Sequence, residues 1–305
     1  MLLDGTRVAH AIRAEVAPRV AAFHSAHSRP PALHIVLVGD DPASHIYVRN
    51  KERAGTDAGL RVKVHRLPAT TTVDELLGTV QALNADAECD GILVQAPLPG
   101  AIGKHGTERV FDAISPAKDV DGFHPHNVGL LVQGRAVLKP CTPSGVIELL
   151  ERTGQTIAGR HAVVIGRSEI VGKPMALLLL QRDATVTVCH SKTPDLASTC
   201  ARADVLVSAI GRPGFVTPAF VKPGAVVIDV GINRLDSREA AVALFGANHA
   251  RLTGFDERGS MVVGDVHPAV EAIAGAMTPV PGGVGPLTIA MLLKNTVTAA
   301  ESIAR

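Results

Sequence analysis

The 305 residues include 46% hydrophobic and 19% charged side chains, a balance typical of a soluble globular protein and not of a disordered chain. Thirty basic and 29 acidic residues give a formal net charge of +1. The chain therefore lacks the basic excess typical of proteins that bind nucleic acid or anionic membranes. With no Trp and one Tyr, it also lacks the aromatic residues on which single-stranded bases stack.

The cysteines and the chain start predict a cytoplasmic protein. The four cysteines lie far apart and form no C-x-x-C pair, which is typical of reduced thiols. The first residues lack a basic segment followed by an apolar one, so no secretory signal is expected. No apolar run approaches the roughly 18 residues of a membrane span. The closest histidine pair, His124 and His126, has no third ligand nearby, which predicts a surface loop and no metal.

The first 100 residues alternate helix and strand patterns, and this alternation predicts a parallel sheet. Asp41 precedes a proline at a predicted helix start, and Thr72 and Glu75 have the spacing of a capping box. In chain order the predicted elements are a helix over 7–24, a strand over 33–39, a helix from 41 to 58, a strand over 61–67, a helix over 72–85 and a strand over 91–95.

A loop-rich stretch over 115–129 separates these elements from a second series. Thr142 followed by Pro143 predicts a helix start, with the threonine as cap. We place the domain boundary there: residues 1–140 form one αβ domain, completed by a final helix over 286–305, and residues 141–285 form another. Two such domains predict a ligand cleft between them.

The most informative segment, residues 162–189, predicts a strand–turn–helix–strand unit of the ~30 residues expected for half a dinucleotide-binding fold. Gly166 ends the first strand, where glycine lets backbone amides approach a pyrophosphate, and the following helix start adds partial positive charge. The spacing of Gly166 and Gly172 departs from G-x-G-x-x-G, so ordinary turn chemistry is the alternative explanation.

The end of the second strand of this unit favours NADP over NAD. An NAD site usually carries Asp or Glu about 20 residues after the glycines, where it binds the ribose 2′-hydroxyl. Here the segment is His190-Ser191-Lys192, which contains no acid, and Arg167 lies in the glycine turn. A cation and a hydroxyl without a carboxylate suit a 2′-phosphate.

Three further groups are candidates for chemistry. Tyr47 and Lys51 are four residues apart and share a helix face. Short-chain dehydrogenases use the same spacing, but their Tyr–Lys pair follows the glycine loop. In this chain the pair precedes the glycine loop by over 100 residues, so a solvated helix face is the alternative. Gln95 ends an apolar strand, where it either binds a ligand or satisfies the turn backbone. Asp119 and Asp121 either bind a ligand or cap turns.

Seven motifs in this order resemble those of the bifunctional methylenetetrahydrofolate dehydrogenase/methenyltetrahydrofolate cyclohydrolase family, nearly end to end. They are Tyr47-Val-Arg-Asn-Lys51, Gln95-Ala-Pro-Leu-Pro99, Lys118-Asp-Val-Asp-Gly-Phe-His-Pro125, Cys141-Thr-Pro-Ser-Gly145, Gly166-Arg-Ser-Glu-Ile-Val-Gly-Lys-Pro174, Asp229-Val-Gly-Ile-Asn233 and Pro279-Val-Pro-Gly-Gly-Val-Gly-Pro286. The resemblance implies two αβ domains, the second Rossmann-like. It implies that NADP takes a hydride from methylenetetrahydrofolate and that water then opens the methenyl cation to formyltetrahydrofolate, in one-carbon metabolism and purine biosynthesis.

The resemblance also implies residue roles. Lys51 is the catalytic residue with Gln95 hydrogen-bonded to it, and a lysine near a cationic substrate is expected to have a lowered pKa. Tyr47 stacks on the folate, and Asp121 accepts hydrogen bonds from the amino-pyrimidine edge of the pterin. The implied folate site comprises Tyr47, Lys51, Val94, Gln95, Ala96, Asp121, Pro281, Gly282, Gly283, Val284 and Gly285. The implied NADP site comprises Gly166, Arg167, Ser168, Ser191 and Ile232.

The sequence departs from the family pattern at several positions. Ser144 replaces a usual Lys or Arg, Leu130 a frequent Arg, Ala96 a common Leu and His267 a usual acid, and residues 235–261 form a longer excursion than expected. The lost cations put nucleotide or polyglutamate affinity in question, but none of the departures touches Lys51 or Gln95. The resemblance implies a homodimer. The alternatives are a monofunctional dehydrogenase and a nucleotide sensor without turnover. A sensor would not need all four of the residues Tyr47, Lys51, Gln95 and Asp121.

Overall fold

A computed structural model describes residues 1–304, and the chain divides into two compact units. One consists of Ala9–Cys141 with Thr288–Arg305, and we call it the three-stranded unit after its sheet. The other consists of Met1–Val8 with Thr142–Leu287, and we call it the five-stranded unit. The chain passes from one unit to the other inside helices α1 (Gly5–His27), α6 (Cys141–Arg152) and α11 (Val284–Ile303).

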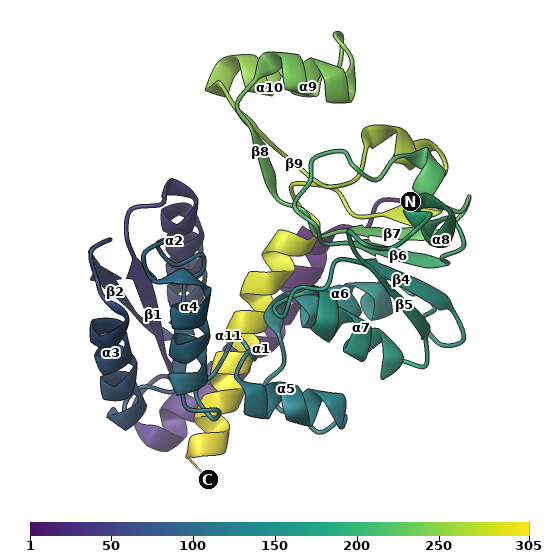
Figure 1. Ribbon diagram of the computed structural model, residues 1–305. Coiled ribbons are helices and arrows are strands. Elements are labelled where there is room, and N and C mark those ends of the chain that lie inside the picture. Colours follow the sequence, from purple (N-terminus) through teal and green to yellow (C-terminus); the bar gives the residue numbers. More distant parts are fainter. Residues whose placement is uncertain (305) are drawn as a thin grey trace. The chain divides into compact units, whose positions relative to one another are not determined.

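The three-stranded unit is built on a parallel sheet with strand order β2-β1-β3 (Figure 1). The central strand is buried at every position, because helices cover both of its faces. Helix α2 packs against β1 and β2, and α3 and α4 pack beside each other over a cluster that includes Val36, Leu76 and Val110. The elements are β1 (Ala32–Val38), α2 (Pro42–Asp57), β2 (Arg61–Leu67), α3 (Val73–Ala85), β3 (Gly91–Val94), α4 (Gly103–Ala113) and α5 (Pro125–Val132).

Local signals in the sequence explain most of these boundaries. The side chain of Asp41 accepts a hydrogen bond from Ser44 N at 2.8 Å and begins α2, as predicted. Thr72 and Glu75 form the predicted capping box of α3. The loop predicted over 115–129 is wrong at its end, because α5 begins at Pro125. His124 Nδ1 accepts the backbone N–H of His126 at 3.0 Å, so this histidine is a helix cap.

The five-stranded unit contains a parallel sheet with strand order β10-β7-β6-β4-β5. From β4 the chain runs to β5 on one side and then to β6 on the other, so the order reverses at β4, where such sheets bind ligands at their carboxyl edge. The elements are β4 (His161–Ile165), α7 (Gly172–Leu180), β5 (Thr185–Cys189), α8 (Leu196–Cys200), β6 (Val205–Ser208), β7 (Val226–Asp229) and β10 (Ala276–Met277), with short 3₁₀ turns η1 (Pro218–Phe220) and η2 (Pro268–Ala272).

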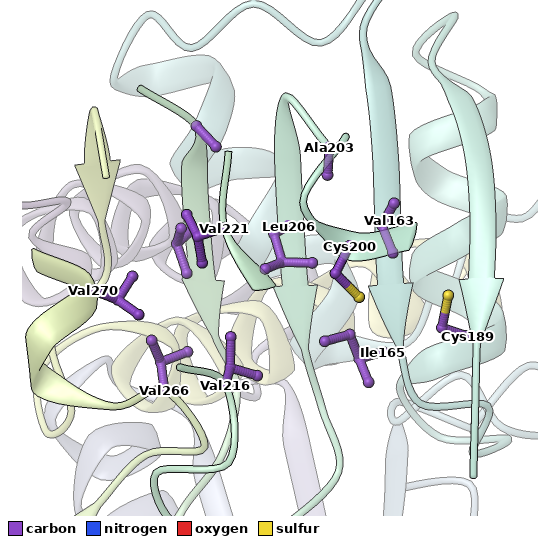
Figure 2. Packing of buried hydrophobic residues seen from close by; sticks show 12 residues of the cluster. Val163, Ile165, Cys189, Cys200, Ala203, Leu206, Val216, Val221, Val266 and Val270 are labelled. Atoms are coloured by element: carbon purple, nitrogen blue, oxygen red, sulfur yellow. The ribbon is translucent and has the colours of Figure 1, made fainter. Parts of the chain in front are cut away.

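One face of this sheet carries the hydrophobic core of the unit (Figure 2). Val163, Ile165 and Leu206 project from the central strands toward Cys200 of α8, and each is at most 1% exposed. Valines from the loops after β6 and β9 close the same cluster. Since burial of such side chains stabilises a fold by about 1.5–3 kcal/mol each, this cluster fixes the strands whose ends form the candidate nucleotide site.

The predicted excursion over 235–261 is a helical hairpin at the end of a two-stranded antiparallel ribbon (Figure 1). Leu252, Phe255 and Ala241 form its own small core with residues of the ribbon. The hairpin is therefore an ordered substructure. The ribbon strands are β8 (Asn233–Leu235) and β9 (Met261–Val263), and the helices are α9 (Arg238–Phe245) and α10 (Arg251–Arg258).

Three boundaries differ from the sequence expectation. Residues Met1–Val8 group with the five-stranded unit, because Leu3 N donates to Met277 O at 2.8 Å and Met277 N donates to Met1 O at 2.9 Å. Helix α6 begins at Cys141, so Thr142 and Pro143 lie inside its first turn. Helix α11 begins at Val284, two residues before the predicted start at 286. Among the described residues, no helix combines the length and hydropathy of a membrane span.

Candidate active site

The three-stranded unit brings Lys51 and Gln95 into direct contact. Lys51 Nζ donates to Gln95 Oε1 at 3.0 Å, from α2 to the residue that follows β3. The Gln95 side chain is buried and its Nε2 donates to the carbonyl of Ala96 at 2.5 Å, which leaves Oε1 to face the lysine. Gln95 N also donates to Val36 O at 2.9 Å, so the strand pairing continues through this residue and fixes its backbone.

Asp121 lies close enough to Lys51 for their charges to interact. Burial raises the pKa of Asp121 to about 6, and the Lys51 ammonium opposes that rise. The nearby Cys141 thiol also lowers the pKa of this carboxylate, while its S–H donates to Val120 O at 3.3 Å. Asp121 thus stays mostly ionised at neutral pH and keeps acceptor capacity for a ligand.

Tyr47 lies one turn before Lys51 on α2, and its side chain is half-buried. Burial raises the pKa of its phenol. Within residues 1–304 the hydroxyl makes no hydrogen bond, so this ring is not held by a polar partner and its face can take part in stacking.

Asp119, two residues before Asp121, has a structural role. Its carboxylate accepts hydrogen bonds from Gly122 N at 3.1 Å, His124 N at 2.8 Å and Asn127 Nδ2 at 2.9 Å. The turn-capping alternative is therefore what the structure shows for Asp119. Nearby, the buried Lys118 Nζ donates to three carbonyls at the end of α3, those of Leu83, Asn84 and Asp86.

In the five-stranded unit, Gly166 ends β4 at the point where the strand order reverses. Its φ is +124°, and a Cβ there would lie 2.4 Å from the carbonyl oxygen of Ala209, after β6. A Cβ on Gly172 would lie 2.3 Å from Gly166 O. Both glycines are therefore required for close backbone packing, which explains the departure from the G-x-G-x-x-G spacing.

The start of α7 differs from the sequence expectation. Ser168 Oγ accepts the N–H groups of Val171 and Gly172, both at 3.2 Å, and Ser168 O accepts that of Lys173 at 3.0 Å. The next residue, Pro174, has no N–H. The first-turn amides are thus used inside the loop and are not free for a pyrophosphate.

The cations of this turn are free. Arg167 is exposed and makes no hydrogen bond or ion pair with any described residue. Ser191 and Lys192 are exposed after the edge strand β5, and no acid lies in the 190–192 segment. Ile232 is 48% exposed after β7. These residues suit a phosphate-bearing nucleotide, since a guanidinium without a partner is the usual ligand of a phosphate.

Residues 281–285 lie in the five-stranded unit as a tightly fixed loop. Gly282 has φ +101°, and its carbonyl accepts Thr6 N at 3.1 Å and Thr6 Oγ1 at 3.3 Å. A Cβ on Gly5 would overlap the carbonyl of Gly283. Gly283 and Val284 are buried, so a ligand would meet the loop chiefly at Pro281, Gly282 and Gly285.

Comparison with known proteins gives the family. Residues 140–304 match the tetrahydrofolate dehydrogenase/cyclohydrolase NAD(P)-binding domain, and residues 3–121 match the catalytic domain of the same family. The chain belongs to this family. A bifunctional protein FolD from Solibacter usitatus is 56% identical over 301 residues, covering 98% of this chain and 97% of that protein. Another from Koribacter versatilis is 52% identical over 300 residues, covering 98% and 96%.

Solved structures agree with this assignment. The Campylobacter jejuni FolD, a methylenetetrahydrofolate dehydrogenase/cyclohydrolase, superimposes with a TM-score of 0.88 at 41% identity, covering 99% of both chains. The Trypanosoma brucei FolD, complexed with NADP cofactor and inhibitor, gives 0.88 at 39% identity, covering 100% of this chain and 98% of that chain. The three-stranded unit therefore contains most of the family's catalytic domain, and the five-stranded unit contains most of its NAD(P)-binding domain.

Two residues of the site were not singled out from the sequence. Cys141 was treated only as a reduced thiol and part of a motif, yet its thiol contacts Asp121 and Val120 O. Asn295 lies buried beside them on α11. The available signal was an amide side chain within the otherwise apolar pattern of the last helix. Among residues 1–304, no group of three His, Cys, Asp or Glu side chains could hold a metal.

Proposed function

We propose that the chain oxidises 5,10-methylenetetrahydrofolate to the methenyl form with NADP and then hydrolyses it to 10-formyltetrahydrofolate. The observation that carries this proposal is the Lys51–Gln95 hydrogen bond beside the ionised Asp121, in the unit that matches the family's catalytic domain. The free Arg167 beside the glycine turn supports the choice of nucleotide.

The nucleotide fits the residues of the five-stranded unit. Gly166 lets β4 pack closely against the Ala209 carbonyl, and this packing fixes the turn that carries Arg167 at the carboxyl edge of the sheet. Arg167 and Ser191 would bind the 2′-phosphate, with Ser168 and Ile232 as further contacts. When bound, NADP supplies the hydride acceptor. Because hydride departure leaves a delocalised cation on the folate, the protein's part in this step is orientation.

Lys51 would act in the hydrolysis. As a neutral amine it accepts a proton from the water that attacks the methenyl carbon, so the new C–O bond forms without a free hydroxide. The lysine ammonium then donates this proton to N5 as the C–N5 bond breaks, and the amine takes up the remaining hydroxyl proton and releases it to solvent, which leaves the formyl group on N10. Gln95 Oε1 accepts one N–H of the lysine and thereby orients the lone pair of Nζ.

The remaining residues would bind the folate. Asp121 accepts hydrogen bonds from the amino-pyrimidine edge of the pterin, and Tyr47 stacks on the aromatic part. Val94 and Ala96 flank Gln95 at the end of β3. Residues Pro281 to Gly285 are proposed as further folate contacts from the family resemblance. We also propose that the protein is cytoplasmic and does not bind nucleic acid, which its free, buried cysteines and near-zero net charge support. The homodimer is proposed from the family resemblance.

A spectrophotometric assay of the purified protein tests the function. With methylenetetrahydrofolate we expect turnover with NADP, weaker turnover with NAD, and decay of the methenyl absorbance faster than in buffer alone. Turnover without accelerated decay would leave a monofunctional dehydrogenase. No turnover with either nucleotide would leave a protein that only binds nucleotide.

The Lys51→Met variant tests the role of the amine. Hydrolysis of methenyltetrahydrofolate should fall at least about 100-fold, the usual contribution of a general base. The matched control is Lys104→Met, which removes an exposed lysine whose ion pair with Glu108 is on the surface. Undiminished hydrolysis by the Lys51 variant would rule out this role.

A further inference from the structure

Asn295 joins two segments of the three-stranded unit that are far apart in the sequence. Its Nδ2 donates to Val120 O at 2.8 Å and to Lys139 O at 2.9 Å, and lies 3.5 Å from Cys141 Sγ. The side chain comes from α11 and is only 6% exposed. Both hydrogens of the amide are therefore committed to carbonyl groups in the protein interior.

The Val120 carbonyl belongs to the peptide bond that leads into Asp121. It accepts a hydrogen bond from Asn295 and another from the Cys141 thiol, at 3.3 Å. An oxygen with both lone pairs occupied in this way cannot rotate without breaking two bonds. The orientation of the Asp121 backbone is thus set from its amino side by these two side chains.

The carboxyl side of Asp121 is fixed by close packing. Gly122 has φ +75°, and a Cβ there would lie 2.5 Å from Lys139 C and 2.6 Å from Pro140 N. The turn that contains Asp121 therefore lies directly against residues 139–140. The Asn295 amide bridges the same two segments, so it holds them at this separation.

We propose that Asn295 is a positioning residue for folate binding, acting through the Val120 carbonyl and Cys141 to orient Asp121. This inference rests on the proposed function, in which Asp121 binds the pterin. An amide suits the position, since it supplies two donors without a charge. A carboxylate of the same shape supplies none and places a negative oxygen against two carbonyl oxygens and beside Asp121.

The test compares Asn295→Asp and Asn295→Ala with Val297→Ala. Val297 is fully buried on the same helix, so its truncation weakens packing but removes no polar contact to the Asp121 segment. For each variant the folate KM, the NADP KM and the thermal unfolding midpoint are measured. The fluorescence of Tyr47, the only tyrosine in a chain without tryptophan, gives the tetrahydrofolate Kd independently of turnover.

We expect Asn295→Asp to raise the folate KM and the tetrahydrofolate Kd at least tenfold, and Asn295→Ala about threefold, with the NADP KM within twofold of wild type. Val297→Ala should lower the unfolding midpoint and leave the folate constants unchanged. Folded Asn295 variants with wild-type folate constants would overturn the proposal, and so would equal shifts in Val297→Ala.

If the Asn295 variants do not fold, Cys141→Ala decides the question, because it removes the second donor to Val120 O and leaves the Asn295 side chain in place. A two- to threefold rise in folate KM supports the proposal and an unchanged KM contradicts it. A wild-type protein without folate-dependent turnover would refute the proposed function alone. The fluorescence titration would then still measure the effect of Asn295, and absence of tetrahydrofolate binding by wild type would refute the inference as well.

Discussion

Each unit contains a pair of neighbouring aspartates, and the two pairs are used differently. In the five-stranded unit, Asp265 accepts hydrogen bonds from the backbone of Ile210, Gly211 and Arg212 and from two side chains. Asp229 accepts three backbone N–H groups. Both carboxylates are buried and their acceptor capacity is taken up by the protein.

In the three-stranded unit the two aspartates divide these tasks. Asp119 accepts three hydrogen bonds, two from its own loop and one from the Asn127 side chain on α5, whereas Asp121 accepts none from a backbone N–H among the described residues and has a lysine at longer range. A carboxylate with few internal donors keeps lone pairs for a ligand. The number of hydrogen-bond donors around an aspartate, more than its burial, therefore distinguishes a structural carboxylate from one that binds a ligand.

The largest expected effect is a loss of stability on substitution of Asp265, one of the two buried aspartates of the five-stranded unit. Asp265→Asn replaces one carboxylate oxygen with an amide NH₂, which faces other donors. At least two of the five groups that donate to Asp265 then lose their acceptor. We expect the free energy of unfolding to fall by about 3 kcal/mol or more. Urea unfolding followed by circular dichroism measures this. The control, Asp236→Asn, removes an exposed partner of Arg234 and should cost less than about 0.5 kcal/mol. A loss of unfolding free energy below about 1 kcal/mol for Asp265→Asn would show that Asp265 is not a structural carboxylate.

Asp121→Asn should act on binding and not on folding. Loss of a charged acceptor for the pterin is expected to raise the folate KM about 30-fold, or about 2 kcal/mol, in both reactions. The NADP KM should not change, and the unfolding midpoint at neutral pH should not fall. Steady-state kinetics with each substrate varied in turn gives these values. Wild-type folate KM in this variant would show that Asp121 is structural like Asp265.

Arg167→Ala tests the ligand-binding group of the five-stranded unit, which is an exposed cation and not a carboxylate. We expect about a tenfold rise in NADP KM, or about 1.4 kcal/mol, and little change with NAD. Arg160→Ala, which removes an exposed arginine just before β4, is the control. An unchanged ratio of NADP to NAD efficiency would remove the phosphate role from Arg167.

The smallest effect is a pH dependence. The pKa of Asp121 is raised to about 6 in the folded protein, above its unfolded value near 3.9, so folding favours the protonated form. Its stabilising contribution is complete below pH 4 and is lost as pH rises through 6. Because the residue retains some solvent contact, we expect about 1 kcal/mol. The difference in unfolding free energy between wild type and Asp121→Asn, measured from pH 4 to 7, should grow with pH in favour of the variant.

Much of the fold was predictable because its signals are local. The Thr72–Glu75 capping box and the Asp41 cap lie within three residues of their partners, and β2 has the predicted bounds. The start of α7 was mispredicted in its chemistry, since the pattern does not show that Ser168 turns back onto the helix amides. The α5 helix was missed because the cap is a histidine, an uncommon cap residue.

The site was predictable only in part. The motifs indicated Lys51, Gln95 and Asp121, and the structure shows the Lys51–Gln95 hydrogen bond. No local pattern separates Asp119 from Asp121, because the difference lies in which backbone amides each one meets after folding. Asn295 is 175 residues from Val120 and 156 from Lys139, so its contacts depend on tertiary structure that spacing does not encode.

The path of the chain through α1, α6 and α11 has a consequence for dissecting this protein. Its two units are consecutive in the family description but interleaved in the polypeptide, since Thr288–Arg305 return to the three-stranded unit and Met1–Val8 begin in the five-stranded one. A fragment that stops at residue 140 would leave Val120 O without its amide donor and would lack Cys141. Neither activity can therefore be isolated by cutting the gene once, and separation would require rejoining the last helix to the first unit by circular permutation.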